Sequence, residues 1–325
     1  MRKKISMVVP CFNEEDNVIP MHDAITHEFT TQEILKKYDF DILYIDNDSK
    51  DKTRERLREL CKQDKEHVKA IFNVKNFGQF NSPYYGMLQA DGDIVVSIAC
   101  DFQDSPELIK DFVEGYEEGY KIVIGVKKTS SDPKLLFAMK KMYYHFARKF
   151  SSCEQIEQFT GFGLYDRDFI EVLKKLDDPT PFLRGIVAEL GYKHKEIKYD
   201  QPKRRSGFSS NNFWTLYDAA MLSITSYTKI GLRIASVIGA ISSFVAIIVA
   251  IVYLIMKLIW WDRFPAGMAP LLIGMLFLGS VQIFFIGLIG EYILTINQRV
   301  MKRPLVIEEE RINFEPEKKE EEKKD

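Results

Sequence analysis

Cysteine is scarce in this chain and follows no metal-binding pattern. The 325 residues include four cysteines, and none has the CxxC spacing of zinc sites or redox motifs. The formal net charge is −2, so the overall charge gives no general attraction to nucleic acid. A signal peptide is also missing from the pattern, because Met1 to Lys4 leads directly into a strand-length apolar run. We therefore expect reduced thiols, no nucleic-acid partner and a cytosolic N-terminus.

Charged residues are missing from two long stretches in the C-terminal third. One stretch runs from Ile234 to Met256 and the other from Phe264 to Gly290. Each exceeds the roughly 20 apolar residues that a helix needs to cross a bilayer, and two in succession favour a transmembrane hairpin over buried soluble helices. Basic residues precede the first stretch and follow the second: Lys229, Arg233, Arg299, Lys302 and Arg303. This bias predicts a multi-pass protein of the cytoplasmic membrane with both chain ends in the cytoplasm.

These features divide the chain into four expected parts. Residues 1–200 form a soluble domain, 201–230 a basic loop and an amphipathic helix, 231–295 two transmembrane helices, and 296–325 a cytosolic tail. The amphipathic helix is expected in the membrane interface, although an ordinary packing helix would have the same pattern. From Glu308 onward charges dominate the tail. We expect a solvated segment there, disordered after about residue 314.

Apolar runs of strand length alternate with helical patterns through the first 200 residues. The expected strands are 4–9, 40–45, 69–72, 94–100, 121–126 and an edge strand at 193–199. Helical spacing lies between them, while the glycine-punctuated segment 159–165 fits a strand or a loop. This alternation predicts an α/β fold with a mostly parallel sheet and right-handed crossovers.

Polar clusters follow three of the expected strands, at residues 10–15, 46–51 and 101–104. Ligands of open α/β sheets bind beyond the carboxyl ends of the strands, so the clusters predict one shared nucleotide pocket. Asp101, Gln103 and Asp104 offer the oxygen atoms that Mg²⁺ or Mn²⁺ prefers. In isolation, Asp104 and Ser105 could instead only cap a helix that begins at Pro106.

Three cations lie together in a loop rich in small residues, between Gln201 and Ser210. They are Lys203, Arg204 and Arg205. Just before the membrane, such cations would meet phosphate groups, either of lipids or of a lipid substrate.

Several segments match the motifs of a known family. Val9–Glu15 reads VPCFNEE, Asp46–Asp51 reads DNDSKD, Lys75–Gly78 reads KNFG, and Asp101–Glu107 reads DFQDSPE. Glu291-Tyr292 and Arg303-Pro304 follow the second apolar stretch. In this order the motifs resemble the family 2 glycosyltransferases of the GT-A fold. The resemblance is closest to the polyprenyl-phosphate glycosyltransferases, which include bactoprenol glucosyltransferases and dolichol-phosphate mannose synthase.

The resemblance implies roles for particular residues. Asp101, Gln103 and Asp104 would be catalytic, and Asp101 and Gln103 would hold Mg²⁺ or Mn²⁺ on the donor diphosphate. The nucleotide pocket would be formed by Pro10, Asn13, Glu15, Asp46, Asp48, Lys75 and Asn76. The acceptor phosphate would be bound by Lys127, Lys203, Arg204, Arg205 and Ser209.

The implied activity is the inverting transfer of a sugar from a nucleotide sugar, expected to be UDP-linked, to polyprenyl phosphate. The product would be a lipid-linked sugar donor for cell-surface glycans, and the resemblance also suggests a homo-oligomer. Two alternatives stay open at this point: a membrane glycosyltransferase with a hydroxyl acceptor, and a non-catalytic membrane protein that binds nucleotide sugars.

The chain departs from the family pattern at three positions. Ala99 replaces the first acid of a DxD motif, Asp48 replaces a glycine, and Gly161 stands where an acidic residue is often found. A hydroxyl acceptor needs a general base, whereas a phosphate monoester, with a second pKa of about 6, is already anionic. Loss of the acid at Gly161 therefore favours a phosphate acceptor.

Overall fold

The computed structural model describes residues 2–128, 156, 158–202, 204–205, 217–218, 221–222, 225, 230–259 and 268–314. The chain divides into two compact units. The first, called the α/β unit, contains the described residues up to Arg205 and those from Lys302 onward. The second, called the helical unit, contains those from Tyr217 to Met301.

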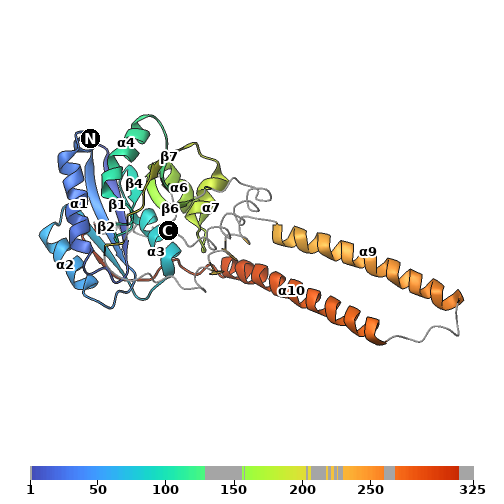
Figure 1. Ribbon diagram of the computed structural model, residues 1–325. Helices are drawn as coiled ribbons and strands as arrows, with labels where there is room; N and C mark the ends of the chain where they lie inside the picture. The colour runs from blue at the N-terminus through green and yellow to red at the C-terminus, as the bar shows by residue number, and fades with distance from the viewer. Residues whose placement is uncertain are drawn as a thin grey trace, which may run out of the picture. The chain divides into compact units, whose positions relative to one another are not determined.

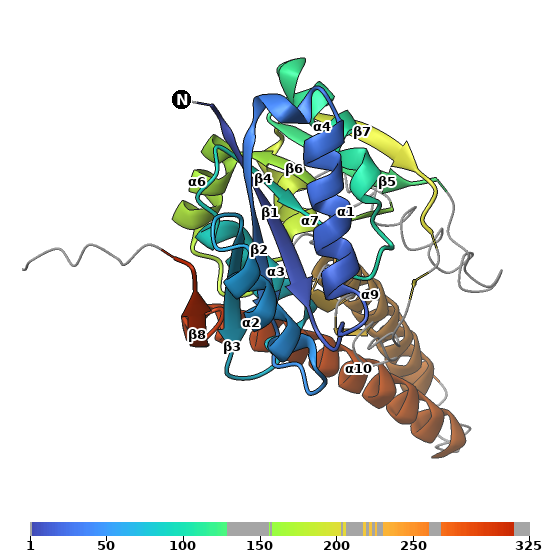
Figure 2. The same ribbon diagram turned by 90° about the vertical axis from the view of Figure 1, so that its left-hand side faces the viewer.

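Within the described residues, a single eight-stranded sheet runs through the α/β unit in the order β7-β5-β6-β4-β1-β2-β3-β8 (Figures 1 and 2). β1 lies parallel to β2 and β4, β2 is parallel to β3, and β5 is parallel to β7. β6 and β8 pair antiparallel with their neighbours. The predicted α/β class with a mostly parallel sheet is confirmed. The strands are β1 (Lys4–Cys11), β2 (Asp39–Asp46), β3 (Val68–Asn73), β4 (Ile94–Ser97), β5 (Ile122–Lys127), β6 (Phe159–Asp166), β7 (His194–Tyr199) and β8 (Glu308–Ile312).

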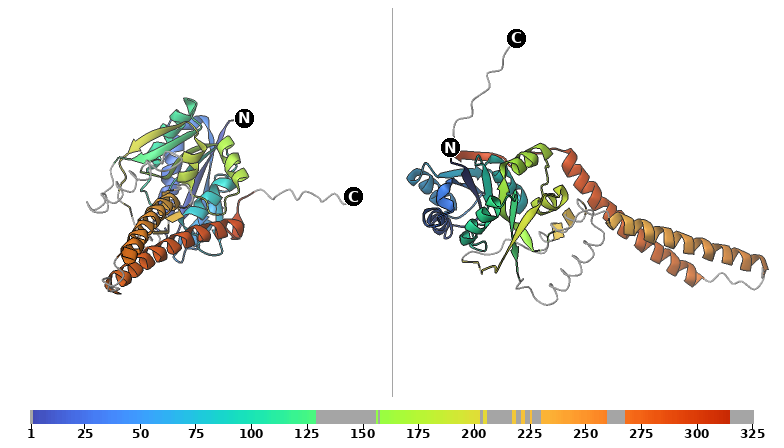
Figure 3. Two further views of the ribbon diagram at one scale, coloured as in Figure 1. Left: turned by 90° about the vertical axis from the view of Figure 1, so that its right-hand side faces the viewer. Right: turned by 90° about the horizontal axis from the view of Figure 1, so that it is seen from above.

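Helices cover both faces of this sheet. Figure 2 shows α1 (Val18–Thr31) and α2 (Thr53–Gln63) in front of it, and the left view of Figure 3, from the opposite side, shows α3 (Gly78–Gln89) and α6 (Arg167–Leu176). Because side chains alternate along a strand, β1 serves both layers. Its odd-numbered residues Ile5, Met7 and Val9 join the cluster that includes α1, α2 and α4 (Ile109–Glu117). Short helical elements complete the unit: η1 (Leu35–Lys37), η2 (Pro106–Leu108) and α7 (Leu183–Leu190).

Close packing on the α3 side depends on one glycine. A Cβ atom added to Gly86 in α3 would lie 2.7 Å from Cγ1 of Val8 and 2.2 Å from Cδ1 of Ile45. Both of those residues are buried in the sheet. Glycine at this position lets α3 approach the ends of β1 and β2 that carry the polar clusters.

The helical unit contains two long helices, α9 (Ile230–Ile259) and α10 (Met268–Val300). Within the described residues, the segment Phe277–Val300 is long and apolar enough to cross a membrane, whereas the apolar segment Val237–Val249 is shorter. In α10, Ile283, Phe284 and Ile286 are 66–72% exposed. The predicted helices exist, and one candidate span is found; the hairpin with two spans stays a prediction. Most of the expected amphipathic helix lies outside the described residues.

The expectation of a solvated tail from Glu308 onward is wrong for its first residues. Glu308–Ile312 form β8, which pairs antiparallel with β3 at the edge of the sheet. After β8, the side-chain amide of Asn313 donates hydrogen bonds to the carbonyl oxygens of Cys61 and Val68, at 2.7 and 2.8 Å. The many charges misled the expectation because they are paired with charges of the α/β unit. Residues 315–325 lie outside the described residues.

Candidate active site

The register of the sheet brings the three polar clusters to one edge. Cys11 at the end of β1 pairs with Asp46 at the end of β2, and Val8 of β1 pairs with Ser97 at the end of β4. The segments that follow are called the β1 loop (residues 12–17), the β2 loop (47–52) and the β4 loop (98–105). Because these parallel strands end at the same edge, the loops are neighbours, as the sequence predicted.

The β1 and β2 loops are joined by hydrogen bonds to backbone groups. The backbone N–H of Asn13 donates to Oγ of Ser49 at 2.9 Å, and Oδ1 of Asn13 accepts from the N–H of Lys50 at 2.8 Å. Oε2 of Glu15 accepts from the N–H of Lys52 at 3.0 Å. Asn13 and Glu15, both predicted for the nucleotide pocket, therefore fix the shape of the two loops.

Each of the three loops holds one residue in the left-handed backbone region. These residues are Asn13 (φ 56°), Asp48 (φ 65°) and Phe102 (φ 61°). Such conformations cost energy in residues other than glycine and occur often at functional sites. The left-handed conformation at Asp48 explains why the family motif has a glycine at this position. Aspartate is among the few other residues that tolerate this conformation. The carboxylate of Asp48 pairs with Lys50 of its own loop at 2.6 Å.

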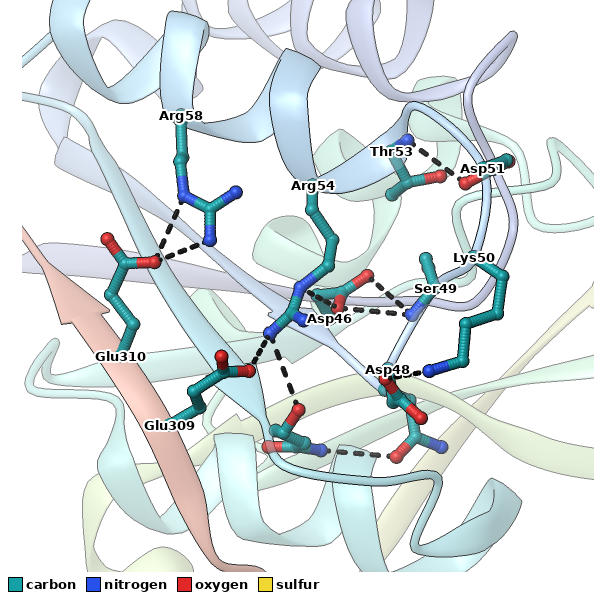
Figure 4. A network of polar contacts seen from close by, with 12 residues as sticks. Asp46, Asp48, Ser49, Lys50, Asp51, Thr53, Arg54, Arg58, Glu309 and Glu310 are labelled. Atoms are coloured by element: carbon teal, nitrogen blue, oxygen red, sulfur yellow. Dashed lines mark hydrogen bonds and ion pairs between the residues drawn. The ribbon is translucent and has the colours of Figure 1, made fainter.

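Asp46 is completely buried at the end of β2 (Figure 4). Oδ2 of Asp46 accepts a hydrogen bond from the N–H of Ser49 at 3.2 Å and lies 3.1 Å from Nε of Arg54. The Arg54 contact is an ion pair without hydrogen-bond alignment, because Nε of Arg54 has no aligned acceptor among the described residues. Burial raises the pKa of Asp46, while Ser49 and Arg54 oppose that shift.

The sequence analysis did not identify Asn47, whose side-chain amide joins the KNFG turn to the β2 loop. Nδ2 of Asn47 donates to Oδ1 of Asn76 at 2.9 Å, and Oδ1 of Asn47 accepts from the N–H of Phe77 at 2.9 Å. Asn76, which is predicted to bind the nucleotide, thus lies beside the β2 loop, while Lys75 is exposed, with its Nζ 5.1 Å from the ring centroid of Phe77. The position of Asn47 between Asp46 and Asp48 is the feature of the sequence that could have identified it as a site residue. Pro10 lies within β1, paired with Ile45.

An arginine from the basic loop connects the β4 loop to the β1 loop. Nε of Arg204 lies 2.9 Å from Oδ2 of Asp101, and its NH2 group lies 3.3 Å from Oε1 of Glu14. The neighbouring Arg205 donates its backbone N–H to the carbonyl oxygen of Asp101 at 3.3 Å, and its guanidinium lies 5.2 Å from the ring centroid of Phe102. Residues predicted to bind the acceptor phosphate therefore contact the predicted metal ligand.

Glu14 is the second site residue that sequence reasoning missed, although it lies inside the VPCFNEE motif. Its side chain is 8% exposed, and Oε2 accepts a hydrogen bond from Nδ2 of Asn17 at 2.6 Å. Burial raises its pKa, against the opposing effects of Asn17 and Arg204. Glu14 and Asp101 together place two carboxylates around one guanidinium.

Asp104 faces inward from the β4 loop and is buried. Its Oδ2 accepts from the backbone N–H of Ala99 at 3.1 Å, and its Oδ1 accepts from the hydroxyl of Tyr199 at 2.9 Å. Burial raises the pKa of Asp104 to about 6, against the opposing hydrogen bonds. Both carboxylate oxygens are thus engaged within the protein, which gives Asp104 a part in shaping the β4 loop.

The raised pKa of Asp104 predicts a pH-dependent difference in stability. Between pH 3.8 and about 6 the folded state keeps a proton that the unfolded state has lost, so this group lowers stability as pH rises. Asp104→Asn removes that cost, which is at most about 3 kcal/mol at neutral pH. We expect the melting temperature of the full chain in detergent, relative to the unmodified chain, to rise by about 5–10 °C more at pH 7.5 than at pH 4. An equal difference at both pH values would contradict a buried, charged Asp104.

The remaining predicted residues are placed less fully. Lys127 lies at the end of β5, and its positive charge acts to lower the pKa of Asp104. The backbone N–H of Gln103 donates to Oδ1 of Asp101 at 3.0 Å. Lys203 and Ser209 lie outside the described residues.

The donor set at Asp101 fits a divalent cation that binds together with a diphosphate. Among the described residues, no three His, Cys, Asp or Glu side chains form a metal-binding group. Mg²⁺ is often held by one or two carboxylates, substrate phosphates and water, and Asp101 can supply one such carboxylate. Arg204, whose cationic group contacts Oδ2, would have to move away for Asp101 to hold the metal through that oxygen.

Comparison with known proteins agrees with this arrangement. Residues 6–175 match the family model "Glycosyl transferase family 2". The chain is 30% identical over 308 residues to the uncharacterized glycosyltransferase sll0501 of Synechocystis, covering 94% of this chain and 95% of that protein. It is 33% identical over 305 residues to the prophage bactoprenol glucosyl transferase homolog of Escherichia coli and to the bactoprenol glucosyl transferase of Shigella phage SfII, covering 94% of this chain and 98% and 97% of those proteins. The chain belongs to glycosyl transferase family 2 and is a glycosyltransferase.

Proposed function

We propose that this glycosyltransferase moves a sugar from a UDP-sugar to polyprenyl phosphate, with inversion, at the cytoplasmic face of a membrane. The observation that carries the proposal is the contact between Arg204 and Asp101. It joins a cationic loop suited to a phosphate with the carboxylate suited to a metal-bound diphosphate. The names of two relatives, bactoprenol glucosyl transferases, support the polyprenyl acceptor.

The donor nucleotide would bind over the β1 and β2 loops, with Asp46 and Asp48 near its base and ribose. The hydrogen bonds of Asn13 and Glu15 hold these loops in a fixed shape before the donor arrives. Such preorganisation lowers the entropy cost of binding. Asp101 would hold the divalent cation, which when bound neutralises charge developing on the leaving diphosphate.

The acceptor phosphate would be held by Arg204, with Arg205 and Lys127 nearby. A phosphate oxygen attacks the anomeric carbon as the bond from that carbon to the diphosphate oxygen breaks, and the electron pair leaves with the nucleoside diphosphate. An anionic phosphate has no proton to lose in this step, so no base is required. This agrees with Gly161, where φ is 104° and an acidic side chain would be strained.

The acceptor itself supports a membrane location. In a cell a polyprenyl chain partitions from water into a bilayer, and the exposed apolar side chains of α10 suit the same environment. The two uncharged stretches would form the hairpin, and the product would be a lipid-linked donor for cell-surface glycans.

A donor screen tests this proposal. The full chain in detergent is incubated with Mn²⁺ or Mg²⁺, undecaprenyl phosphate and radiolabelled UDP-glucose, UDP-galactose, UDP-N-acetylglucosamine or GDP-mannose. We expect one UDP-sugar to give an organic-soluble product that carries a single sugar, and GDP-mannose to give none. A product with several sugars, or no labelled lipid from any donor, would contradict the proposal.

A further inference from the structure

The strand that follows α10 contacts the candidate nucleotide site through an arginine. Arg54 in the first turn of α2 has its Nε 3.1 Å from Oδ2 of Asp46 and its NH2 group 2.6 Å from Oε2 of Glu309 in β8 (Figure 4). The same NH2 group approaches the carbonyl oxygen of Asn73 at 3.5 Å, and the guanidinium lies 5.3 Å from the ring centroid of Phe72. Arg54 is thus held between Asp46 and the C-terminal strand.

A bulge in β8 aims Glu309 at this arginine. Phe72 pairs with Glu310 and Asn73 with Glu308, so Glu309 is an extra residue opposite that step. Consecutive side chains of a regular strand point to opposite faces, and a bulge changes that direction. Here Glu309 reaches Arg54 while Glu310 reaches Arg58, one turn further along α2.

The ion pairs Arg54–Glu309 and Arg58–Glu310 differ in the other residues that each arginine contacts. Arg58 contacts Glu310 at 2.7 Å, and its guanidinium lies 4.7 Å from the ring centroid of Phe72. Arg54 contacts Asp46 directly. The exposed fractions of the glutamate side chains are 52% for Glu309 and 39% for Glu310, so both pairs add little to stability.

We propose that Glu309 is a positioning residue for the donor site: it holds Arg54 against the buried Asp46, which accepts from the N–H of Ser49, and thereby fixes the β2 loop over which the nucleotide would bind. β8 then has two roles: it pairs with the edge of β3, and through Glu309 it positions residues of the donor site. This proposal rests on the proposed function, because it places the nucleotide over the β2 loop that Asp46 supports.

Two neighbouring glutamates provide a matched test. Glu309→Gln and Glu310→Gln each remove one charge from β8, but the first alone loosens Arg54. The full chain in detergent with Mn²⁺ is titrated with UDP, GDP and CDP, and the tightest of these is used for the variants. We expect Glu309→Gln to weaken its affinity about three- to fivefold and to raise the donor KM by the same factor, with kcat within twofold. Glu310→Gln should leave affinity and KM unchanged.

Equal affinities in the two variants would overturn the proposal. If Glu309→Gln does not fold, Arg54→Lys and Arg58→Lys serve as the pair, with weaker binding expected for Arg54→Lys alone. Asp46→Asn separates this proposal from the proposed function. Weaker binding in Asp46→Asn with none in Glu309→Gln contradicts only the role of Glu309, whereas normal binding in Asp46→Asn, or no binding of any diphosphate by the unmodified chain, contradicts the nucleotide site itself.

Discussion

Replacing Asp101 with asparagine is expected to lower kcat/KM for sugar transfer by about 100- to 1000-fold. The amide oxygen can still accept a hydrogen bond from the N–H of Gln103, which keeps the shape of the β4 loop, whereas the oxygen that contacts Nε of Arg204 is replaced by an NH₂ group. The amide lacks the charge that binds a divalent cation. Loss of one group that stabilises developing charge commonly lowers kcat by a factor of about 100 to 1000. The measurement is the initial rate of labelled lipid formation, with nucleotide affinity titrated in parallel.

The nucleotide titration identifies the cause of the loss. In the unmodified chain Mn²⁺ should strengthen nucleotide binding, and in Asp101→Asn this effect should disappear. Asp168→Asn is the control, since Asp168 is 71% exposed and pairs with Lys121 outside the site. Full activity of Asp101→Asn, or an equal Mn²⁺ effect in both chains, would contradict the assigned role of Asp101.

Replacing Arg204 with alanine is expected to lower kcat/KM for the acceptor by about 100-fold while nucleotide binding stays equal or becomes tighter. The loss follows because a guanidinium that binds the phosphate also stabilises its charge in the transition state. The gain follows because Arg204 contacts Asp101 at 2.9 Å and Glu14 at 3.3 Å, and its removal leaves their negative charge to a metal ion. Acceptor kinetics and Mn²⁺-dependent nucleotide titration measure the two effects.

Opposite effects on acceptor and donor distinguish this role from a structural one. Lys195→Ala is the control, because it removes a cation of the same α/β unit that pairs with Glu118. Weaker nucleotide binding together with a lower melting temperature in Arg204→Ala would mean that the arginine mainly holds the loops together. Unchanged acceptor kinetics would exclude it from phosphate binding.

The meeting of the three loops could be predicted from the sequence because it follows from local rules. Apolar runs of strand length alternate with helices, so their polar ends share one edge of a parallel sheet. The positions of Asn13, Asp46 and Asp101 agree with this expectation.

Contacts between distant segments were beyond the local patterns. Periodicity does not show that Arg204 reaches Asp101, 103 residues away in sequence, or that Glu309 reaches Arg54 over 255 residues. A run of charges such as Glu308–Arg311 reads as solvated until its partners on α2 are known. Burial is also not visible in the sequence. As an aspartate in a polar cluster, Asp104 resembles a metal ligand, but in the structure its carboxylate accepts hydrogen bonds from Ala99 and Tyr199 inside the protein.

The most direct test of the central claim compares two acceptors of equal chain length, polyprenyl phosphate and the corresponding polyprenol, with the same nucleotide sugar and metal ion. The contact between Arg204 and Asp101 and the glycine at position 161 predict transfer to the phosphate alone. Transfer to the alcohol at a comparable rate would contradict the account.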